Sequence, residues 1–114
     1  IRLKPPVVAV YRLKDTRRYG RMEIKGRRLV GVKEKVEEAK PGLVNAGVYL
    51  FPRQVFGWIR KTPLSLRKEY EITDTIQMMI NQGLQFTVSQ LKDFWTDITY
   101  QTDLEKARNF ATTR

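Results

Sequence analysis

Asp97 is the acidic residue whose surroundings in the sequence most clearly raise a question of chemistry. It lies in the run Phe94-Trp95-Thr96-Asp97-Ile98, whose β-type residues predict a half-buried strand. An ionised carboxylate is costly to bury unless a cation or several hydrogen-bond donors meet it. Two interpretations are therefore open. Asp97 lies at a solvent-exposed strand end, or it binds a hard cation such as Mg²⁺, which prefers carboxylate and phosphate oxygens.

Glu34 and Lys35 form a second candidate group, next to the predicted end of a hairpin strand. A carboxylate can accept hydrogen bonds from two sugar hydroxyls, and a lysine can neutralise a phosphate as a point charge. The alternative is a solvated hairpin end within a lysine-rich region.

The segment Glu71-Ile72-Thr73-Asp74 is a third candidate group. Thr73 or Asp74 can cap a helix, and an acidic residue in the first turn suits the helix dipole. The start of a helix is thus one sufficient explanation of the segment. The functional interpretation places Glu71 at the mouth of a pocket, where its carboxylate accepts hydrogen bonds from ligand hydroxyls.

The composition limits the chemistry that is available. The chain has 114 residues, which suits one domain with a modest core, and it contains no cysteine and no histidine. A disulfide framework, a thiolate zinc site and a histidine base are therefore excluded from these 114 residues. Catalysis would have to use carboxylates, lysines, backbone groups or a bound ion.

The net charge of +10 is unevenly distributed. Residues 1–40 hold 13 Lys and Arg against 5 acidic residues. Such a balance is compatible with a nucleic-acid surface, a site for phosphorylated small molecules, or a solvated face. No apolar stretch approaches the roughly 20 residues that span a bilayer, and residues 1–6 lack the features of a signal peptide. We therefore expect a cytoplasmic protein.

Strand and helix patterns alternate along the chain. They predict, in order, a strand at 7–13, a β-hairpin over 19–35, a buried central strand at 43–51, a helix that starts at Pro52, a helix over 72–81, strands at 85–91 and 94–98, and a helix that starts with a capping box at 102–105. This mixture favours a single domain over 1–114, of α/β class, with three layers and a mixed sheet.

Several residues give these elements their expected details. Gly47 would permit a close approach by another group to the 43–51 strand, and Gly83 would end the 72–81 helix. The inward faces of the first and last helices are expected to comprise Val55, Phe56 and Ile59, and Leu104, Ala107 and Phe110, respectively.

The order and spacing of five motifs is more specific than any one of them. The motifs are Tyr19-Gly20, Glu34-Lys35, the Asn-Ala-Gly-Val-Tyr-Leu-Phe run at 45–51, the Glu-Ile-Thr-Asp run at 71–74, and the Trp-Thr-Asp run at 95–97. Over roughly residues 7–110, the chain resembles the second half of the sugar-1-phosphate nucleotidyltransferases. This family includes glucose-1-phosphate thymidylyltransferase, UDP-glucose pyrophosphorylase and mannose-1-phosphate guanylyltransferase.

The resemblance implies a Rossmann-like fold and a specific reaction. In that family a sugar 1-phosphate attacks the α-phosphate of a nucleoside triphosphate and releases pyrophosphate, with Mg²⁺ bound by two aspartates. Asp97 matches the second of these aspartates, and Glu34 and Lys35 match the pair that holds the sugar and its phosphate. Lys35 and Asp97 would thus be the catalytic residues. The remaining contacts to the sugar would come from Gly20, Asn45, Gly47, Glu71 and Thr73.

The sequence also departs from the family pattern. Val36 stands where proline is usual, and Thr99-Tyr100-Gln101 replaces the usual Gly-Thr-Pro. These 114 residues contain neither the Gly-rich phosphate loop nor the first metal-binding aspartate. We therefore expect the C-terminal half of a nucleotidyltransferase domain without its nucleotide-binding half, inactive by itself. Its partners would be the missing half or a partner chain, with a homo-oligomer also open. The alternatives are a basic α/β module that binds nucleic acid and a degenerate regulatory homologue.

Overall fold

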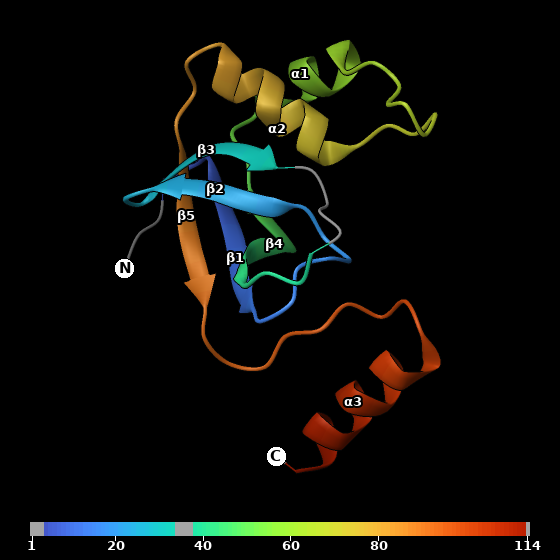
Figure 1. Cartoon of the computed structure of the whole chain (residues 1–114). Helices are drawn as coiled ribbons and strands as arrows, with labels where there is room; N and C mark the ends of the chain where they lie inside the picture. The colour runs from blue at the N-terminus through green and yellow to red at the C-terminus, as the bar shows by residue number, and fades with distance from the viewer. Residues whose placement is uncertain (1–3, 34–37, 114) are drawn as a thin grey trace.

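The computed structural model describes residues 4–33 and 38–113, which form a five-stranded mixed sheet and three helices (Figure 1). The elements in chain order are β1 (Val7–Leu13), β2 (Arg21–Lys25), β3 (Arg28–Lys33), β4 (Gly42–Leu50), α1 (Val55–Lys61), α2 (Ile72–Asn81), β5 (Phe86–Leu91) and α3 (Gln101–Thr112). No helix within the described ranges is long and apolar enough to cross a membrane. The predicted residues Glu34 and Lys35 lie outside the described residues.

The sheet is mixed, as predicted, but it closes on itself. β1 pairs with β4 in antiparallel and with β5 in parallel orientation. The β2–β3 hairpin joins β4 on one side and β5 on the other, which gives the order β1-β4-β2-β3-β5. Register irregularities in the β1–β4 and β2–β3 pairs add to the local twist and let the hairpin bend over.

Closure of the sheet changes the expected layering. In a three-layer fold, helices cover both faces of one open sheet. Here α1 and α2 lie together beside β3, and α3 lies at the opposite end of the molecule (Figure 1). The expectation of three layers is wrong for the described residues, because the twisted hairpin brings β3 back to β5.

β1 is the central strand of the core. It has a neighbour on each side, and its first four residues, Val7–Val10, are buried. Such a strand reads as a continuous apolar run rather than an alternating one. The fully buried cluster around it comprises Val8, Val10, Met22, Leu29, Val55, Ile76, Met79 and Phe86.

α2 begins and ends at the predicted residues. Ile76 and Met79 have no exposed surface and face the sheet. Gly83 follows the helix with φ of +92°, a left-handed conformation that favours glycine, so its predicted role at the helix end is confirmed.

α1 differs from its prediction in both start and orientation. The helix begins at Val55, and Val55 is buried, but Phe56 and Ile59 are 61% and 43% exposed. The inward stripe instead runs through Val55, Trp58 and Thr62, the last at the end of the helix. The inward residues thus recur at helical spacing, as predicted, but Trp58 rather than Ile59 faces the core.

The predicted strand at 94–98 is absent from the described chain, where these residues form an irregular connection between β5 and α3. β5 has β1 on one side and β3 on the other, so its sheet edges are already occupied. The large side chains of this connection, residues 92–100, make individual tertiary contacts instead. Local β-propensity is commonly overridden in this way.

α3 begins at Gln101, one residue before the predicted start, and Tyr100 precedes it, so the capping box predicted over 102–105 is wrong. The Asp103 carboxylate accepts the Tyr100 amide hydrogen bond at 3.0 Å, which is the expected contact of the third helical residue in a capping box. Leu104, Ala107 and Phe110 are only half-buried. Phe110 stacks on Phe94 at 4.4 Å between ring centroids, so part of the apolar face packs on the helix's own preceding connection.

Gly47 interrupts β4 for a reason other than the expected one. Its φ is +81°, and a Cβ atom added there would meet no atom within 4 Å. Glycine is therefore needed for the left-handed backbone and not for a close approach. The Gly47 amide donates to Asn45 Oδ1 at 2.8 Å, which closes a tight turn within the strand.

We predict that Gly47→Ala lowers the free energy of unfolding by about 1–2 kcal/mol, because left-handed backbone costs an L-residue roughly this amount. Gly57→Ala in α1 is the matched control, since its added methyl also meets no atom within 4 Å and its φ is not left-handed. This control should gain about 0.4–1 kcal/mol. Urea denaturation followed by circular dichroism measures both. Equal effects of the two substitutions would contradict this explanation of Gly47.

Candidate functional site

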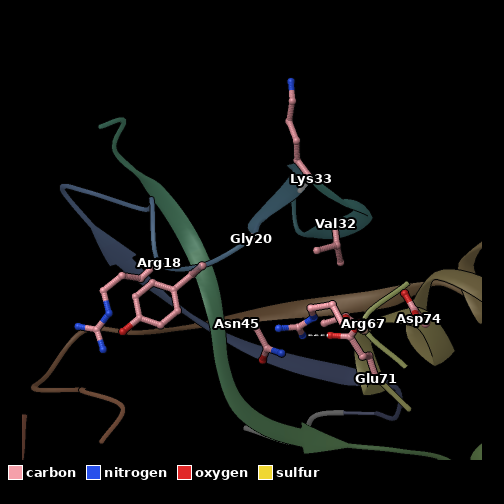
Figure 2. Close-up of a pocket in the computed structure, with 10 residues that line it drawn as sticks. Arg18, Gly20, Val32, Lys33, Asn45, Arg67, Glu71 and Asp74 are labelled. Carbon is pink, nitrogen blue, oxygen red and sulfur yellow. Dashed lines mark hydrogen bonds and ion pairs between the residues drawn. The ribbon is translucent and has the colours of Figure 1, made fainter. Parts of the chain in front are cut away.

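A cavity of about 380 Å³ opens where the start of β2, the end of β3, β4 and the start of α2 meet (Figure 2). Its lining residues are Arg18, Tyr19, Gly20, Val32, Lys33, Asn45, Arg67, Glu71, Thr73 and Asp74. The lining is rich in charged and polar groups of both signs. It therefore suits a small polar ligand better than an apolar one.

Four of the predicted site residues line this one cavity: Gly20, Asn45, Glu71 and Thr73. They come from three separate segments of the chain, since Glu71 and Thr73 both lie at the start of α2. Gly47 is not part of the lining, although it shapes the β4 turn beside Asn45. The contacts of these residues with a ligand stay predictions.

Gly20 is required by a close approach of two backbone segments. A Cβ atom at this position would lie 3.0 Å from the Lys33 carbonyl oxygen and 3.3 Å from Val32 Cγ1. Only glycine lets the segment before β2 pack so closely on the end of β3. This contact forms one wall of the cavity, and the Lys33 side chain extends away from it (Figure 2).

Gln77 of α2 holds the opposite wall in place. Its Oε1 atom accepts a hydrogen bond from the Val32 amide at 3.2 Å. The bond ties α2 to the edge of β3, and so fixes Thr73 and Asp74 relative to the end of that strand. Sequence reasoning missed Gln77, for which the only signal is a polar residue directly after the apolar Ile76.

Glu71 is the residue before the first turn of α2, but its side chain does not cap the helix. Its carboxylate instead accepts a hydrogen bond from Arg67, four residues earlier (Figure 2). Arg67 also lies 3.7 Å from Glu69. Sequence reasoning missed Arg67, which brings a guanidinium to the cavity next to a carboxylate.

Asn45 is held by hydrogen bonds at both ends of its amide. Its Oδ1 atom accepts the Gly47 amide, and its Nδ2 atom donates to the Tyr49 hydroxyl oxygen. Burial raises the pKa of Tyr49, and the bond from Asn45 opposes this increase. An amide fixed in this way presents one orientation to the cavity.

Asp97 lies outside the cavity lining, in the 92–100 connection. Its carboxylate accepts hydrogen bonds from the Tyr19 and Thr99 hydroxyls, the latter at 2.5 Å, and lies 3.5 Å from Arg18 Nη2. Burial raises its pKa, but the bonds from Thr99 and Tyr19 and the charge of Arg18 outweigh this effect and leave the pKa below its ordinary value. The carboxylate is thus ionised at neutral pH.

Tyr19 connects the cavity to Asp97. It lines the cavity, and its hydroxyl donates to Asp97 Oδ1. Burial first, and the Asp97 carboxylate second, raise the pKa of Tyr19 to about 12. The hydroxyl therefore remains a hydrogen-bond donor throughout the physiological range.

Asp103 is a functional candidate that sequence reasoning identified only as part of a helix cap. Its side chain is 3% exposed, and its Oδ2 atom accepts hydrogen bonds from Arg18 Nη2 at 3.1 Å and from the Thr99 and Tyr100 amides. Arg18 and then these amides lower the pKa of Asp103 from 3.8 to about 2. The carboxylate fastens the start of α3 to the segment that borders the cavity.

Comparison with known proteins assigns the chain to a family. A nucleotidyl transferase family model matches residues 6–114. The chain belongs to the nucleotidyl transferase family. The relationship predicted from the five motifs is confirmed at this level.

Individual relatives of this nucleotidyl transferase chain agree with the assignment. The bifunctional protein GlmU of Methanocaldococcus jannaschii is 31% identical over 104 residues, which cover 90% of this chain and 25% of that protein. The glucose-1-phosphate thymidylyltransferase of Streptomyces griseus is 30% identical over 94 residues, or 82% of this chain and 26% of that protein. The chain thus spans about a quarter of these relatives.

Solved structures share the fold. A Bacillus anthracis protein assigned as a glucose-1-phosphate thymidylyltransferase, in complex with sucrose, superposes with a TM-score of 0.76 and 29% identity over 93% of this chain and 43% of that one. A UDP-glucose pyrophosphorylase without ligand has a TM-score of 0.76 at 20% identity, which supports the fold alone. The nucleotidyl transferase chain therefore has an established mixed α/β architecture.

The family resemblance predicts Mg²⁺ at Asp97, and the described residues of this transferase chain do not fit such an ion as they stand. Within them, no three acidic side chains are grouped to hold a metal. Arg18 already brings a positive charge to the Asp97 carboxylate, and the nearby Asp103 is engaged by three donors. The metal-binding role of Asp97 therefore stays a prediction.

We predict that Asp103→Asn weakens the fold at pH 7 and reduces its acid sensitivity. The depressed pKa of Asp103 stabilises the native state above pH 3.8, and this contribution is lost as the pH falls from about 4 towards 2. Urea unfolding at several pH values measures the effect. Glu105→Gln, at an exposed position of the same helix, is the control. Parallel pH profiles for Asp103→Asn and the wild type would contradict the assignment.

Proposed function

We propose that this chain supplies the sugar-phosphate-binding part of a sugar-1-phosphate nucleotidyltransferase. That enzyme converts a nucleoside triphosphate and a sugar 1-phosphate into a nucleotide sugar and pyrophosphate. In this proposal the chain is the C-terminal half of the domain, and another half or partner chain supplies the nucleotide site. The observation that carries the proposal is the meeting of Gly20, Asn45, Glu71 and Thr73 at one cavity.

The cavity has the size and the polar groups that a monosaccharide phosphate requires. Its volume of about 380 Å³ lies at the small end of the range for ligand pockets, about 300–1,000 Å³. Sugar hydroxyls both donate and accept hydrogen bonds. Asn45 and Thr73 offer groups of both kinds, and Glu71 offers an acceptor that the Arg67 guanidinium holds in place.

The phosphate of the ligand requires a cation, and Lys35 is the proposed one. Lys33 and Val32 border the cavity, and Glu34 and Lys35 follow them directly in the sequence. In this proposal Glu34 accepts hydrogen bonds from sugar hydroxyls, and Lys35 neutralises the phosphate. Phosphoryl-group chemistry depends mainly on positioning and charge neutralisation, so the absence of histidine is no obstacle.

We predict that the 114-residue chain binds glucose 1-phosphate and that Lys35→Ala weakens this binding at least about tenfold, because a hydrogen bond to a charged group contributes roughly 1.5–3 kcal/mol. Isothermal titration calorimetry measures both affinities. Lys92→Ala is the matched control, because Lys92 is exposed and borders a different hollow of the surface. Glucose without phosphate should bind Lys35→Ala and wild type equally.

Two outcomes would contradict the proposed function. One is equal affinity of Lys35→Ala and wild type for glucose 1-phosphate, and the other is no binding by the wild type up to about 10 mM, an order of magnitude above ordinary substrate constants. Tight, steeply salt-dependent binding of a DNA duplex or single strand would instead support the nucleic-acid alternative.

We also predict that the isolated chain releases no pyrophosphate. Mixed with Mg²⁺, a nucleoside triphosphate and glucose 1-phosphate, it provides a sugar-phosphate site without the Gly-rich loop that cradles the triphosphate. A coupled pyrophosphate assay, with a complete glucose-1-phosphate thymidylyltransferase as positive control, measures the rate. A rate above that of the buffer would contradict the assignment of the chain to half of a catalytic domain.

A further inference from the structure

We infer that Arg18 is a positioning residue that serves as the built-in counter-ion of Asp97, with Asp103 holding Arg18 in place. Arg18 Nη2 lies 3.5 Å from Asp97 Oδ2 and 3.1 Å from Asp103 Oδ2. One nitrogen atom thus lies between two carboxylate oxygens. The catalytic meaning of this bridge rests on the proposed function, but the bridge itself does not.

The Arg18 guanidinium is held in place by two aromatic rings as well as by charge. Its central carbon lies 4.8 Å from the ring centre of Tyr100 and 5.5 Å from that of Tyr19. A guanidinium over an aromatic face gains cation–π attraction in addition to its ion pairs. In Figure 2 the side chain turns away from Arg67 and Glu71, so Arg18 borders the cavity without pointing into its centre.

Asp97 depends on such contacts because the sheet does not fix it. The 92–100 connection makes no strand ladder, and it is anchored at Trp95, whose indole donates to the Ala46 carbonyl oxygen at 3.0 Å. The orientation of the Asp97 carboxylate is then set by Tyr19, Thr99 and Arg18. Of these three, only Arg18 brings a full charge.

The bridge has a consequence for divalent cations. Mg²⁺ and Mn²⁺ are hard ions that bind carboxylate oxygens. Arg18 Nη2 lies close to both Asp97 Oδ2 and Asp103 Oδ2, so a cation that binds both carboxylates must displace the guanidinium. Removal of Arg18 leaves two like charges facing the same space, and this arrangement favours a divalent ion.

The test uses Mn²⁺ as a paramagnetic probe of the 114-residue chain, with the amide resonances of Thr99 and Tyr100 as reporters. We expect Arg18→Gln to show localised broadening of these resonances at Mn²⁺ concentrations about tenfold lower than the wild type requires. Arg18→Lys keeps the charge and should behave as the wild type does. Asp97→Asn added to Arg18→Gln should abolish the gain.

Arg17→Gln is the matched control for net charge. Arg17 pairs with Asp15 on the surface, so its loss removes the same charge without touching Asp97. Equal Mn²⁺ sensitivity of Arg18→Gln and Arg17→Gln would overturn the inference, as would an equal gain in Arg18→Lys. If Arg18 only stabilises the fold, Arg18→Gln should lose the native amide spectrum and should not bind Mn²⁺ more tightly than the wild type.

Tyr100→Ser provides a second route if Arg18→Gln fails to fold. Tyr100 is 60% exposed, and serine is a favourable residue before a helix. The substitution removes the ring that holds the guanidinium but leaves all charges, and part of the Mn²⁺ gain should appear. No gain would contradict the inference. The experiment contains no sugar, so failure of glucose 1-phosphate binding would count against the proposed function alone.

Discussion

The buried carboxylate of Asp103 is the constraint on which the arrangement of the site depends. An ionised group with 3% of its side chain exposed is tolerated only if donors meet it, and Asp103 has Arg18 and two backbone amides. Phe110 of α3 stacks on Phe94 of the preceding connection, and α3 lies away from the sheet, so this apolar contact alone does not fasten the helix to the sheet. The polar contacts of Asp103 therefore do more than cap a helix. They hold the C-terminal region against the segment that borders the cavity.

Aromatic residues supply the apolar counterpart of this polar attachment. Trp95 lies 5.5 Å from the Tyr11 ring and 5.9 Å from the Tyr19 ring, and its indole donates to Ala46 in the β4 turn. Tyr19 belongs to the cavity wall and also donates to Asp97. The cavity and the Asp97 connection are thus joined through Tyr19.

Periodicity predicted the parts of the fold whose residues face one continuous surface. The β1 strand, the hairpin and α2 follow from such patterns. The same kind of pattern wrongly predicted a strand at 94–98 and the wrong inward face for α1. Phe56 and Ile59 are apolar but exposed, and Trp95 is satisfied by tertiary contacts, so local propensity misleads at both places. For the site, the motif order predicted four residues that line the cavity. It did not predict the ion pair of Arg18 with Asp103, because partners 85 positions apart leave no local pattern. It also missed the pair of Arg67 with Glu71, because a spacing of four residues indicates a contact only within a helix, and Arg67 lies in a turn before α2.

The β2–β3 hairpin carries basic residues at both of its ends, and the two groups lie far apart. Arg21 pairs with Lys33 at the end beside the cavity, and Lys25 pairs with Arg28 at the tip. Strands rise about 3.3 Å per residue, so roughly 13 Å separate the two ends. The basic residues at the tip are exposed and too far away to contact a small ligand in the cavity. The net charge therefore overstates the number of cations that a ligand in the cavity can meet, because the lining includes only Arg18, Lys33 and Arg67 among the described basic residues.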